Sequence, residues 1–234
     1  MLMHLYQYIK YQNIETYLQI KLLLILLCMK SNNKELIVQD PFVKFYPEPH
    51  KYYDLKRKCY VARSVSDVIK TTDYVSKNME KAAERGTKIH AAVQIWCETG
   101  DIPLALAYAE EYKNWVKHLI NYRMWETWKP IVNELRMIDR KRDIAGSVDT
   151  ILQHKNTGML CLADYKTQEK YIKKNHSLQI GGYVSLFYQN YPNLSLFSCR
   201  IIYITPDGIK TQEYNPNECM YDYEAARSQY FKKR

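Results

Sequence analysis

The sequence has few cysteines, and none of them stand in positions where they could act together. The six cysteines are at positions 28, 59, 97, 161, 199 and 219, so no two are closer than 20 residues. This spacing excludes a CxxC zinc knuckle and the framework of a disulfide-rich secreted domain. Cys97 and Cys161 lie within apolar runs and are expected in the core. The sequence therefore favours an intracellular, reducing location, whether cytoplasm, nucleoid, virus-infected cell or organelle.

Long hydrophobic runs are also lacking. The most apolar stretch, residues 22–29, holds eight uncharged residues, which is too short to span a bilayer, and no small-x-small cleavage site follows it. We expect residues 1–33 to form an apolar appendage that is buried or covered by a partner, such as a replication or recombination protein. Residues 34–234 then form the main domain. Secretion or membrane attachment is the alternative interpretation.

Acidic residues are in deficit. There are 34 Lys and Arg against 25 Asp and Glu, a formal net charge of +9. The basic residues cluster at 56–58, 140–142, 170–174 and 232–234. Such clusters favour a polyanionic partner, although a solvated basic surface is equally compatible with them. Tyrosine is abundant, with 22 copies, most of which are expected to fill the core.

The pattern of apolar residues predicts the elements of an α/β or α+β domain. Helices are expected at 76–98, 103–122, 174–190 and from 218 onward, and strands at 129–139, 143–153, 159–166, 196–205 and 209–215. A hairpin is expected within 50–62, followed by a short helix to about residue 70 that Ser64 or Ser66 could cap. This order predicts a central mixed β-sheet flanked by helices.

Two aspartates are predicted to face each other across a hairpin. If residues 155–158 form a four-residue loop, the numbers of paired residues add up to 313, and Asp149 lies opposite Asp164. Lys166, two residues further on, shares their face. Opposed carboxylates repel each other, and a divalent cation would offset the repulsion more than the lysine could. The alternative is a surface Asp–Lys pair in another register, since a shift of one residue turns one aspartate away.

Four short motifs occur in one order along the chain: "GTKIH" (86–90), "IAGSVDTIL" (144–152), "LADYKT" (162–167) and "QIGGY" (179–183). Together they resemble the RecB-like branch of the PD-(D/E)XK nuclease superfamily, which includes viral and mitochondrial exonucleases. Its motifs are G-T-x-x-H, G-x-x-D, (D/E)-x-K and Q-x-x-x-Y. The resemblance implies a restriction-endonuclease-like core and a Mg²⁺- or Mn²⁺-dependent deoxyribonuclease, more often an exonuclease, in DNA replication, recombination or repair.

The resemblance also implies roles for single residues. Asp149 and Asp164 would ligate the metal together with the backbone carbonyl of Tyr165, and His90 would be a further ligand. Glu134, on the preceding strand, is a secondary candidate ligand. Without the resemblance, His90 would be interpreted as a packed core histidine, because it lies on the apolar stripe of its helix.

Three further residues have implied roles in the reaction. Lys166 would orient or deprotonate the attacking water and stabilise charge on the phosphate. Gln179 and Tyr183, which are i and i+4 on one helix face, would position the DNA backbone. The intervening Gly181 and Gly182 weaken a helix, so they suggest close packing against the sheet or the substrate.

The expected partner is DNA, as a single strand or a duplex end, held without reading its sequence. The candidate DNA-binding residues are Lys56, Arg57, Lys58, Arg140, Lys141, Arg142, Lys170, Lys173 and Lys174. The isolated Cys199 and Cys219 predict no iron–sulfur cluster, and the lack of a Walker A loop predicts no use of ATP. Alternatives are a catalytically silent DNA-binding module of the same fold and a structure-specific endonuclease.

Overall fold

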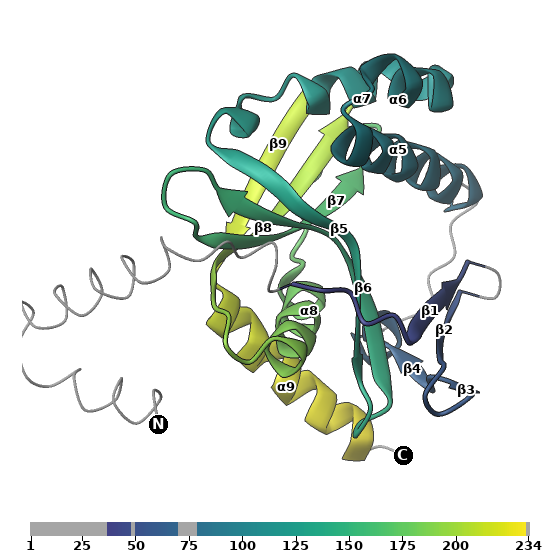
Figure 1. Cartoon of the computed structure of the whole chain (residues 1–234), viewed down its shortest axis with the longest axis vertical. Coiled ribbons are helices and arrows are strands. Elements are labelled where there is room, and N and C mark those ends of the chain that lie inside the picture. Colours follow the sequence, from purple (N-terminus) through teal and green to yellow (C-terminus); the bar gives the residue numbers. More distant parts are fainter. Residues whose placement is uncertain (1–36, 48–49, 70–78, 233–234) are drawn as a thin grey trace, which may run out of the picture.

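The computed structural model of the chain describes residues 37–47, 50–69 and 79–232 (Figure 1). The predicted appendage at 1–33 lies outside the described residues, as do the last two basic residues of the 232–234 cluster. Within the described part, no helix is long and apolar enough to cross a membrane.

A mixed β-sheet forms the centre of the molecule. Its strands follow the order β4-β6-β7-β8-β9, with β5 also paired to β6. β6 runs antiparallel to β5 and β7, whereas β7 runs parallel to β8. The strands are β4 (Arg63–Ser64), β5 (Trp128–Asp139), β6 (Ile144–His154), β7 (Leu160–Thr167), β8 (Leu196–Thr205) and β9 (Gly208–Tyr214). The predicted mixed α/β fold is confirmed, and the five long strands lie within one or two residues of the predicted ranges.

Helices cover both faces of this sheet (Figure 1). One face packs against α5 (Met79–Thr99), α6 (Ile102–Tyr108) and α7 (Lys113–Ile120) through a core that includes Ile89, Leu119 and Ile202. The other packs against α4 (Val65–Ile69), α8 (Ser177–Asn190) and α9 (Pro216–Lys232) through a core that includes Ile151, Phe187 and Ile201. The sheet is thus buried on both sides, which explains the nearly continuous apolar sequence of β7 and β8.

The prediction of a single helix at 103–122 is wrong. The chain instead forms α6, the 3-10 turn η1 (Glu110–Tyr112) and α7, followed by a second 3-10 turn, η2 (Arg123–Glu126). The break occurs at Ala109, whose φ of −116° and ψ of 46° are not helical. Ala109 is buried in the same core as Val116 and Leu119. The break therefore redirects the chain so that helices on both sides of Ala109 pack on one core.

The predicted hairpin at 50–62 is present and belongs to a larger element. β2 (Lys51–Asp54) pairs with β3 (Cys59–Tyr60), and β1 (Val43–Tyr46), which the sequence pattern did not predict, pairs with the other edge of β2. We call β1–β3 the small sheet. The predicted cap of the following helix is also present, because the Ser64 Oγ accepts a hydrogen bond from the Asp67 backbone N–H at 3.1 Å.

The predicted hairpin register between β6 and β7 is confirmed. Thr150 pairs with Ala163 and Gln153 with Leu160, so the pairs follow the predicted sum of 313. The His154 backbone N–H donates to the Met159 carbonyl at 2.9 Å, which closes the hairpin at the predicted residue. The ladder ends one pair before the two aspartates, so Asp149 and Asp164 lie where the two strands begin to part.

The glycine pair of α8 is tightly packed, as predicted, but not against the sheet or a substrate. A Cβ on Gly181 would lie 1.9 Å from the Cys219 backbone carbonyl oxygen, which belongs to α9. A Cβ on Gly182 would lie 2.4 Å from Val65 Cγ1, which belongs to α4. The glycines therefore let three helices approach one another, and α8 in turn is held against the sheet.

Candidate functional site

A cleft of about 660 Å³ collects the predicted site residues from five different elements. It is lined by residues of α5, the large sheet, α8 and the small sheet. Of these elements, α5 and the small sheet lie to the right of β6 in Figure 1. Its lining includes His90 from α5, Glu134 from β5, Asp149 from β6, Asp164 and Lys166 from β7, and Gln179 and Tyr183 from α8. Residues up to about 90 positions apart in the sequence thus share one cavity.

The β5–β6 pair is distorted at the site. Glu134 has a φ of +49°, a left-handed conformation that is unfavourable for a strand residue with a side chain. The ladder pairs on either side of it, Asn133 with Thr150 and Leu135 with Val148, place Glu134 opposite Asp149. Strained backbone of this kind costs about 1–3 kcal/mol and is concentrated at functional sites. Here it accompanies a glutamate and an aspartate that both line the cleft.

Three side chains of the cleft could hold a metal ion. Donor atoms of His90, Glu134 and Asp149 all lie within 4.8 Å of one another. The His90 Nδ1 is 3.3 Å from Asp149 Oδ1. One imidazole nitrogen and two carboxylates suit a divalent cation such as Mn²⁺, and the carboxylates also suit Mg²⁺. Glu134, the secondary candidate from sequence, is therefore one of the three grouped donors.

Asp164 lines the same cleft but is engaged differently from Asp149. Its Oδ2 is 2.6 Å from the Lys166 Nζ, and it is not one of the three grouped donors. Asp149 instead accepts a hydrogen bond at 2.5 Å from the backbone N–H of Tyr165. The Tyr165 ring is buried in the core beneath α5, and a role for its carbonyl as a ligand stays a prediction.

The pKa values of these groups reflect carboxylates crowded into a partly buried site. Burial and then the charge of Asp149 raise the pKa of Glu134 to about 7. Burial, opposed by Lys166 and reinforced by Asp149, raises the pKa of Asp164 to about 6. Burial lowers the pKa of His90, but the Asp149 carboxylate more than reverses this and brings it to about 9. Without a metal, the site therefore retains protons near neutral pH, and a divalent cation could replace them.

Lys166 remains charged in this environment. Burial alone would lower its pKa, but the Asp164 and Asp149 carboxylates raise it above the usual value. A lysine that holds its proton so firmly is suited to stabilising negative charge and poorly suited to removing a proton from water. Both roles that the resemblance implies for Lys166 stay predictions, and the raised pKa favours the electrostatic one.

These pKa shifts predict how the metal-free protein responds to pH. The folded state raises the pKa of three groups: to about 7 for Glu134, about 6 for Asp164 and about 9 for His90. A group with a raised pKa stabilises the folded protein at low pH, and this contribution is lost as the pH rises through the raised pKa. We expect the melting temperature in chelator to fall between about pH 6 and about pH 9. Added Mn²⁺ should reverse most of this fall, as measured by thermal unfolding at both pH values.

The control for this effect is the Glu134→Gln/His90→Gln variant. It removes two of the three groups, so its melting temperature should change less with pH and respond less to Mn²⁺. An equal pH response in the variant and the wild-type protein would contradict the assignment.

Gln179 and Tyr183 lie together as predicted. The Gln179 Nε2 donates a hydrogen bond to the Tyr183 Oη at 3.0 Å, and both side chains line the cleft. The Tyr183 ring is nearly buried, with 7% of its surface exposed, and it packs in the core beneath α8. The hydrogen bond therefore holds the polar ends of both side chains at the wall of the cleft.

The sequence interpretation missed several residues of the cleft. Arg136 lines the cleft and supplies a second basic side chain there, in addition to Lys166. Ser147 pairs with Arg136 across the β5–β6 ladder and accepts a hydrogen bond at 3.1 Å from the Tyr52 Oη of the small sheet. Arg136 and Ser147 are each two residues from a predicted site residue, Glu134 and Asp149. Strand alternation could therefore have indicated them, whereas Tyr52 gave no local signal.

Comparisons with known proteins add little to this description. No protein-family model matches the chain, and no curated protein matches it. Among solved structures, the chain is similar to one described as "Crystal structure of SSO0001". The two are 16% identical over 70% of this chain and 73% of that one, with a TM-score of 0.29. A similarity this low supports no conclusion about fold or function.

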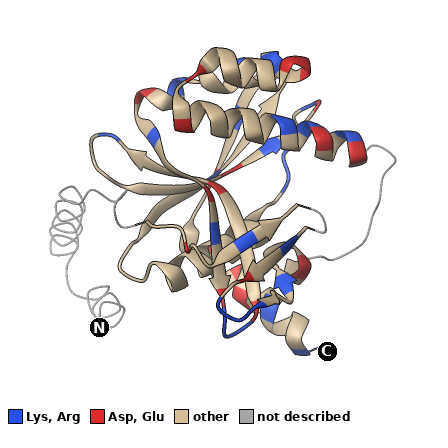
Figure 2. Ribbon diagram, turned by 45° about the vertical axis from the view of Figure 1, so that its right-hand side comes forward, with Lys and Arg blue, Asp and Glu red and all other residues tan. Residues whose placement is uncertain are grey.

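The predicted DNA-binding residues lie outside the lining of the cleft, and three of them are engaged within the protein. Arg57 pairs with Asp54 and Asp143, Arg140 pairs with Asp40 and Asp54, and Arg142 pairs with Asp139. Figure 2 shows these basic loops next to acidic positions at the lower edge of the molecule. The three arginines therefore have partners within the protein, and DNA contact stays a prediction for all nine residues.

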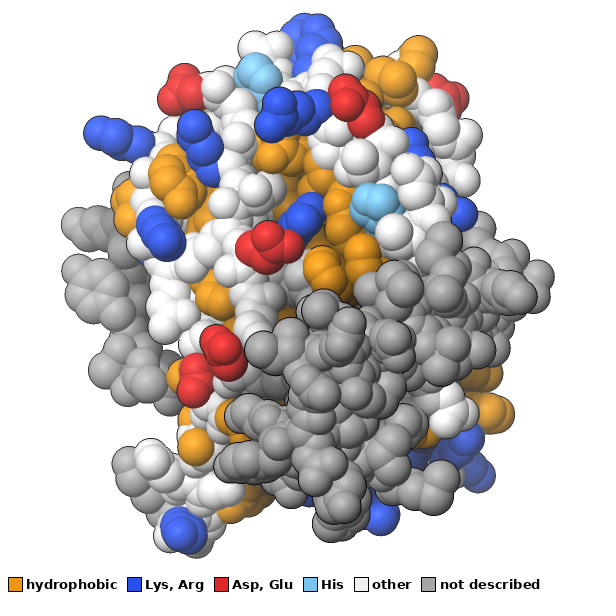
Figure 3. Space-filling view, turned by 90° about the vertical axis from the view of Figure 1, so that its left-hand side faces the viewer, with side chains coloured by type: hydrophobic (Ala, Val, Ile, Leu, Met, Phe, Trp, Pro, Cys, Tyr) orange, Lys and Arg blue, Asp and Glu red, His pale blue; other side chains and the backbone are white. Residues whose placement is uncertain are grey.

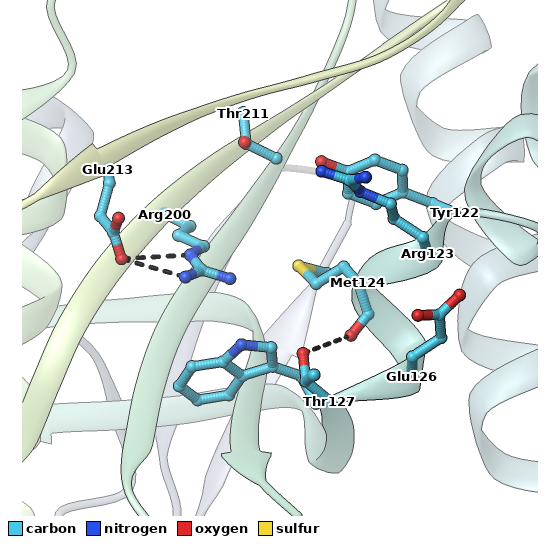
Figure 4. A pocket seen from close by; sticks show the side chains of 9 residues that line it. Tyr122, Arg123, Met124, Glu126, Thr127, Arg200, Thr211 and Glu213 are labelled. Carbon is cyan, nitrogen blue, oxygen red and sulfur yellow. Dashed lines mark hydrogen bonds and ion pairs between the residues drawn. The ribbon is translucent and has the colours of Figure 1, made fainter.

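A second hollow, of about 500 Å³, lies between η2 and the β8–β9 strands (Figure 4). Its main basic group, Arg200, is 3.0 Å from Glu213 and stacks 5.0 Å from the Trp128 ring centre. The hollow lacks the grouped donors found in the cleft. In the part of the face that Figure 3 draws in colour, basic, acidic and hydrophobic side chains lie intermingled. The cleft is therefore the stronger candidate for chemistry.

Proposed function

We propose that this protein is a metal-dependent nuclease that hydrolyses phosphodiester bonds of DNA, working as an exonuclease. One observation carries the proposal: the His90, Glu134 and Asp149 donors share a cleft with the paired Asp164 and Lys166. The four motifs that resemble RecB-like PD-(D/E)XK nucleases supply every one of these residues except Glu134. The net charge of +9 is consistent with a polyanionic substrate.

The residues present fit a divalent cation, because they bring carboxylates and an imidazole together in a partly buried site, where the carboxylates repel each other without one. His90, Glu134 and Asp149 would hold the ion, with Asp164 directly beside them. A bound Mg²⁺ or Mn²⁺ would supply an activated water and polarise the phosphoryl oxygens.

The remaining side chains would act on the substrate directly. Lys166 holds a positive charge next to the carboxylates, where negative charge develops on the phosphate during hydrolysis. Arg136 lines the same cavity and would fix a neighbouring phosphate. The Gln179–Tyr183 pair presents polar atoms to the sugar–phosphate backbone. None of these groups needs to read a base, so cleavage is expected to be independent of sequence.

The test compares end-labelled linear DNA with circular single-stranded DNA, in Mg²⁺, Mn²⁺ or chelator. Degradation of the linear molecules alone would identify an exonuclease, and cutting of both would identify an endonuclease. Parallel RNA substrates would show whether the activity is restricted to DNA. A mobility shift without cleavage under any metal would contradict the proposal and favour a silent DNA-binding module.

A further inference from the structure

One face of the small sheet carries a cluster of tyrosines that contact one another. Tyr46, Tyr53 and Tyr60 come from β1, β2 and β3 respectively. Their ring centroids are 6.3 Å apart for Tyr46–Tyr53, 6.1 Å for Tyr46–Tyr60 and 5.2 Å for Tyr53–Tyr60. Tyr46 is 39% exposed and Tyr60 is 50% exposed. These exposed fractions are large for aromatic side chains that already contact one another, so the cluster presents ring surface to solvent.

Two lysines share this face with the tyrosines. Lys44 pairs with Tyr53, and Lys51 pairs with Tyr46. Paired residues, and residues two apart in one strand, point to the same side of a sheet. The Lys51 Nζ lies 5.8 Å from the centre of the Tyr60 ring. We call Lys44, Tyr46, Lys51, Tyr53 and Tyr60 the tyrosine platform.

The lysines of the platform have no carboxylate partner among the residues that the structure describes. Within the described part of the chain, neither Lys44 nor Lys51 forms an ion pair. The nearby Arg57 and Arg140, by contrast, are fully engaged with carboxylates. Exposed rings beside unpaired ammonium groups form a surface that is complementary to bases joined by phosphates.

The opposite face of the same sheet forms a wall of the cleft. Phe45 and Tyr52 line the cavity, and their ring centroids are 4.9 Å apart. Pro47 and His50, from the connection between β1 and β2, also line it. The last ladder pair before this connection is Tyr46–Lys51, which belongs to the platform. The platform and the cleft therefore meet at that end of the small sheet, on the right of Figure 1.

We propose that the tyrosine platform binds single-stranded nucleic acid. Bases stack on the exposed rings of Tyr46 and Tyr60 and on the partly exposed ring of Tyr53, and phosphates lie against Lys44 and Lys51. A single strand is required because a duplex hides the base faces that stacking uses. The strand then passes the His50 end of the small sheet and enters the cleft. Only this last step rests on the proposed nuclease function, since the platform binds the strand by itself.

The experiment measures binding separately from cleavage. Fluorescence anisotropy with labelled oligothymidylate of about 20 nucleotides, in chelator, gives the affinity for a single strand without base pairing. The same measurement with oligouridylate and with a duplex distinguishes DNA from RNA and single from double strands. The variants are Tyr46→Ala/Tyr60→Ala, Tyr46→Phe/Tyr60→Phe and, as a matched control, Tyr108→Ala/Tyr221→Ala. The control tyrosines are 55% and 69% exposed on α6 and α9.

We expect the alanine pair at the platform to weaken single-strand binding by at least about tenfold, because each stacked base contributes substantially to affinity. The phenylalanine pair keeps the rings and should bind within about twofold of the wild-type protein, as should the control pair. Unchanged binding by the platform alanine variant would overturn the proposal, as would a preference of the wild-type protein for duplex. A protein that binds through the platform yet cleaves nothing in Mg²⁺ or Mn²⁺ would leave the platform established and refute the nuclease.

Discussion

An Asp149→Asn protein is expected to lose metal binding and DNA cleavage together, with cleavage falling by about 10³-fold or more. Asp149 is within 4.8 Å of the donors of His90 and Glu134 and accepts the Tyr165 N–H at 2.5 Å. An amide keeps the shape of the side chain but carries no negative charge to attract the ion. Initial rates on end-labelled single-stranded DNA and calorimetric Mn²⁺ titration would measure the two effects.

Lys166→Met should separate these two effects. Its Nζ is paired with Asp164 at 2.6 Å and supplies no ligand atom, so Mn²⁺ binding should survive. Cleavage should fall by about 10²–10³-fold, which is typical when one group that stabilises transition-state charge is removed. The different outcomes for Asp149 and Lys166 would assign one residue to the metal and the other to the phosphate.

The controls for both variants are exposed residues of the same chemical type. Asp222 lies on the surface of α9 and Lys210 on β9, and both are exposed. Asp222→Asn and Lys210→Met should cleave like the wild-type protein. If Asp149→Asn cleaves as fast as these controls, the assignment of the metal centre is wrong.

A Gly181→Ala protein is expected to be about 3 kcal/mol less stable than the wild-type protein. The new Cβ would lie 1.9 Å from the Cys219 carbonyl oxygen and 2.8 Å from Tyr223 Cβ. A backbone carbonyl cannot rotate away as a flexible side chain can, so α8 and α9 would have to separate. The midpoint of urea unfolding, followed by circular dichroism, measures the change.

Gly86→Ala is the matched comparison. Gly86 also lies within a helix, but its Cβ would meet only the Thr167 Oγ1 at 3.6 Å, an ordinary contact. Removing the conformational freedom of this glycine should raise stability by up to about 1 kcal/mol. Equal stability changes in the two variants would show that the α8–α9 contact is not as close as described.

The sequence predicted features that depend on local chemistry. The turn residues Asn156 and Gly158 and the alternation of the flanking strands were enough to predict the β6–β7 register. The Asp–x–Lys spacing predicted that Asp164 and Lys166 share a face, and they form an ion pair. The i, i+4 spacing likewise predicted the Gln179–Tyr183 contact, which is a hydrogen bond.

Features that depend on distant partners were not predicted. The helix break at Ala109 serves a core formed with α7. Close packing at Gly181 was predicted, but not its partner α9, which is about 40 residues away in the sequence. The left-handed Glu134 has no local signal, because glutamate is an unusual residue for that conformation. Arg57 and Arg140 looked like free cations, since the carboxylates that pair with them come from other segments.

The buried Asp54 has a mechanical consequence for any chain that enters the site. It is fully buried and joins Arg57 of its own turn to Arg140 at the end of β5, and those arginines reach on to Asp143 and Asp40. Three segments are thereby joined around one buried carboxylate, so the small sheet is expected to move together with the β5–β6 turn. Because Tyr52 of the small sheet also lines the cleft, we expect that wall of the cleft to keep its position relative to the β5–β6 turn when a chain enters.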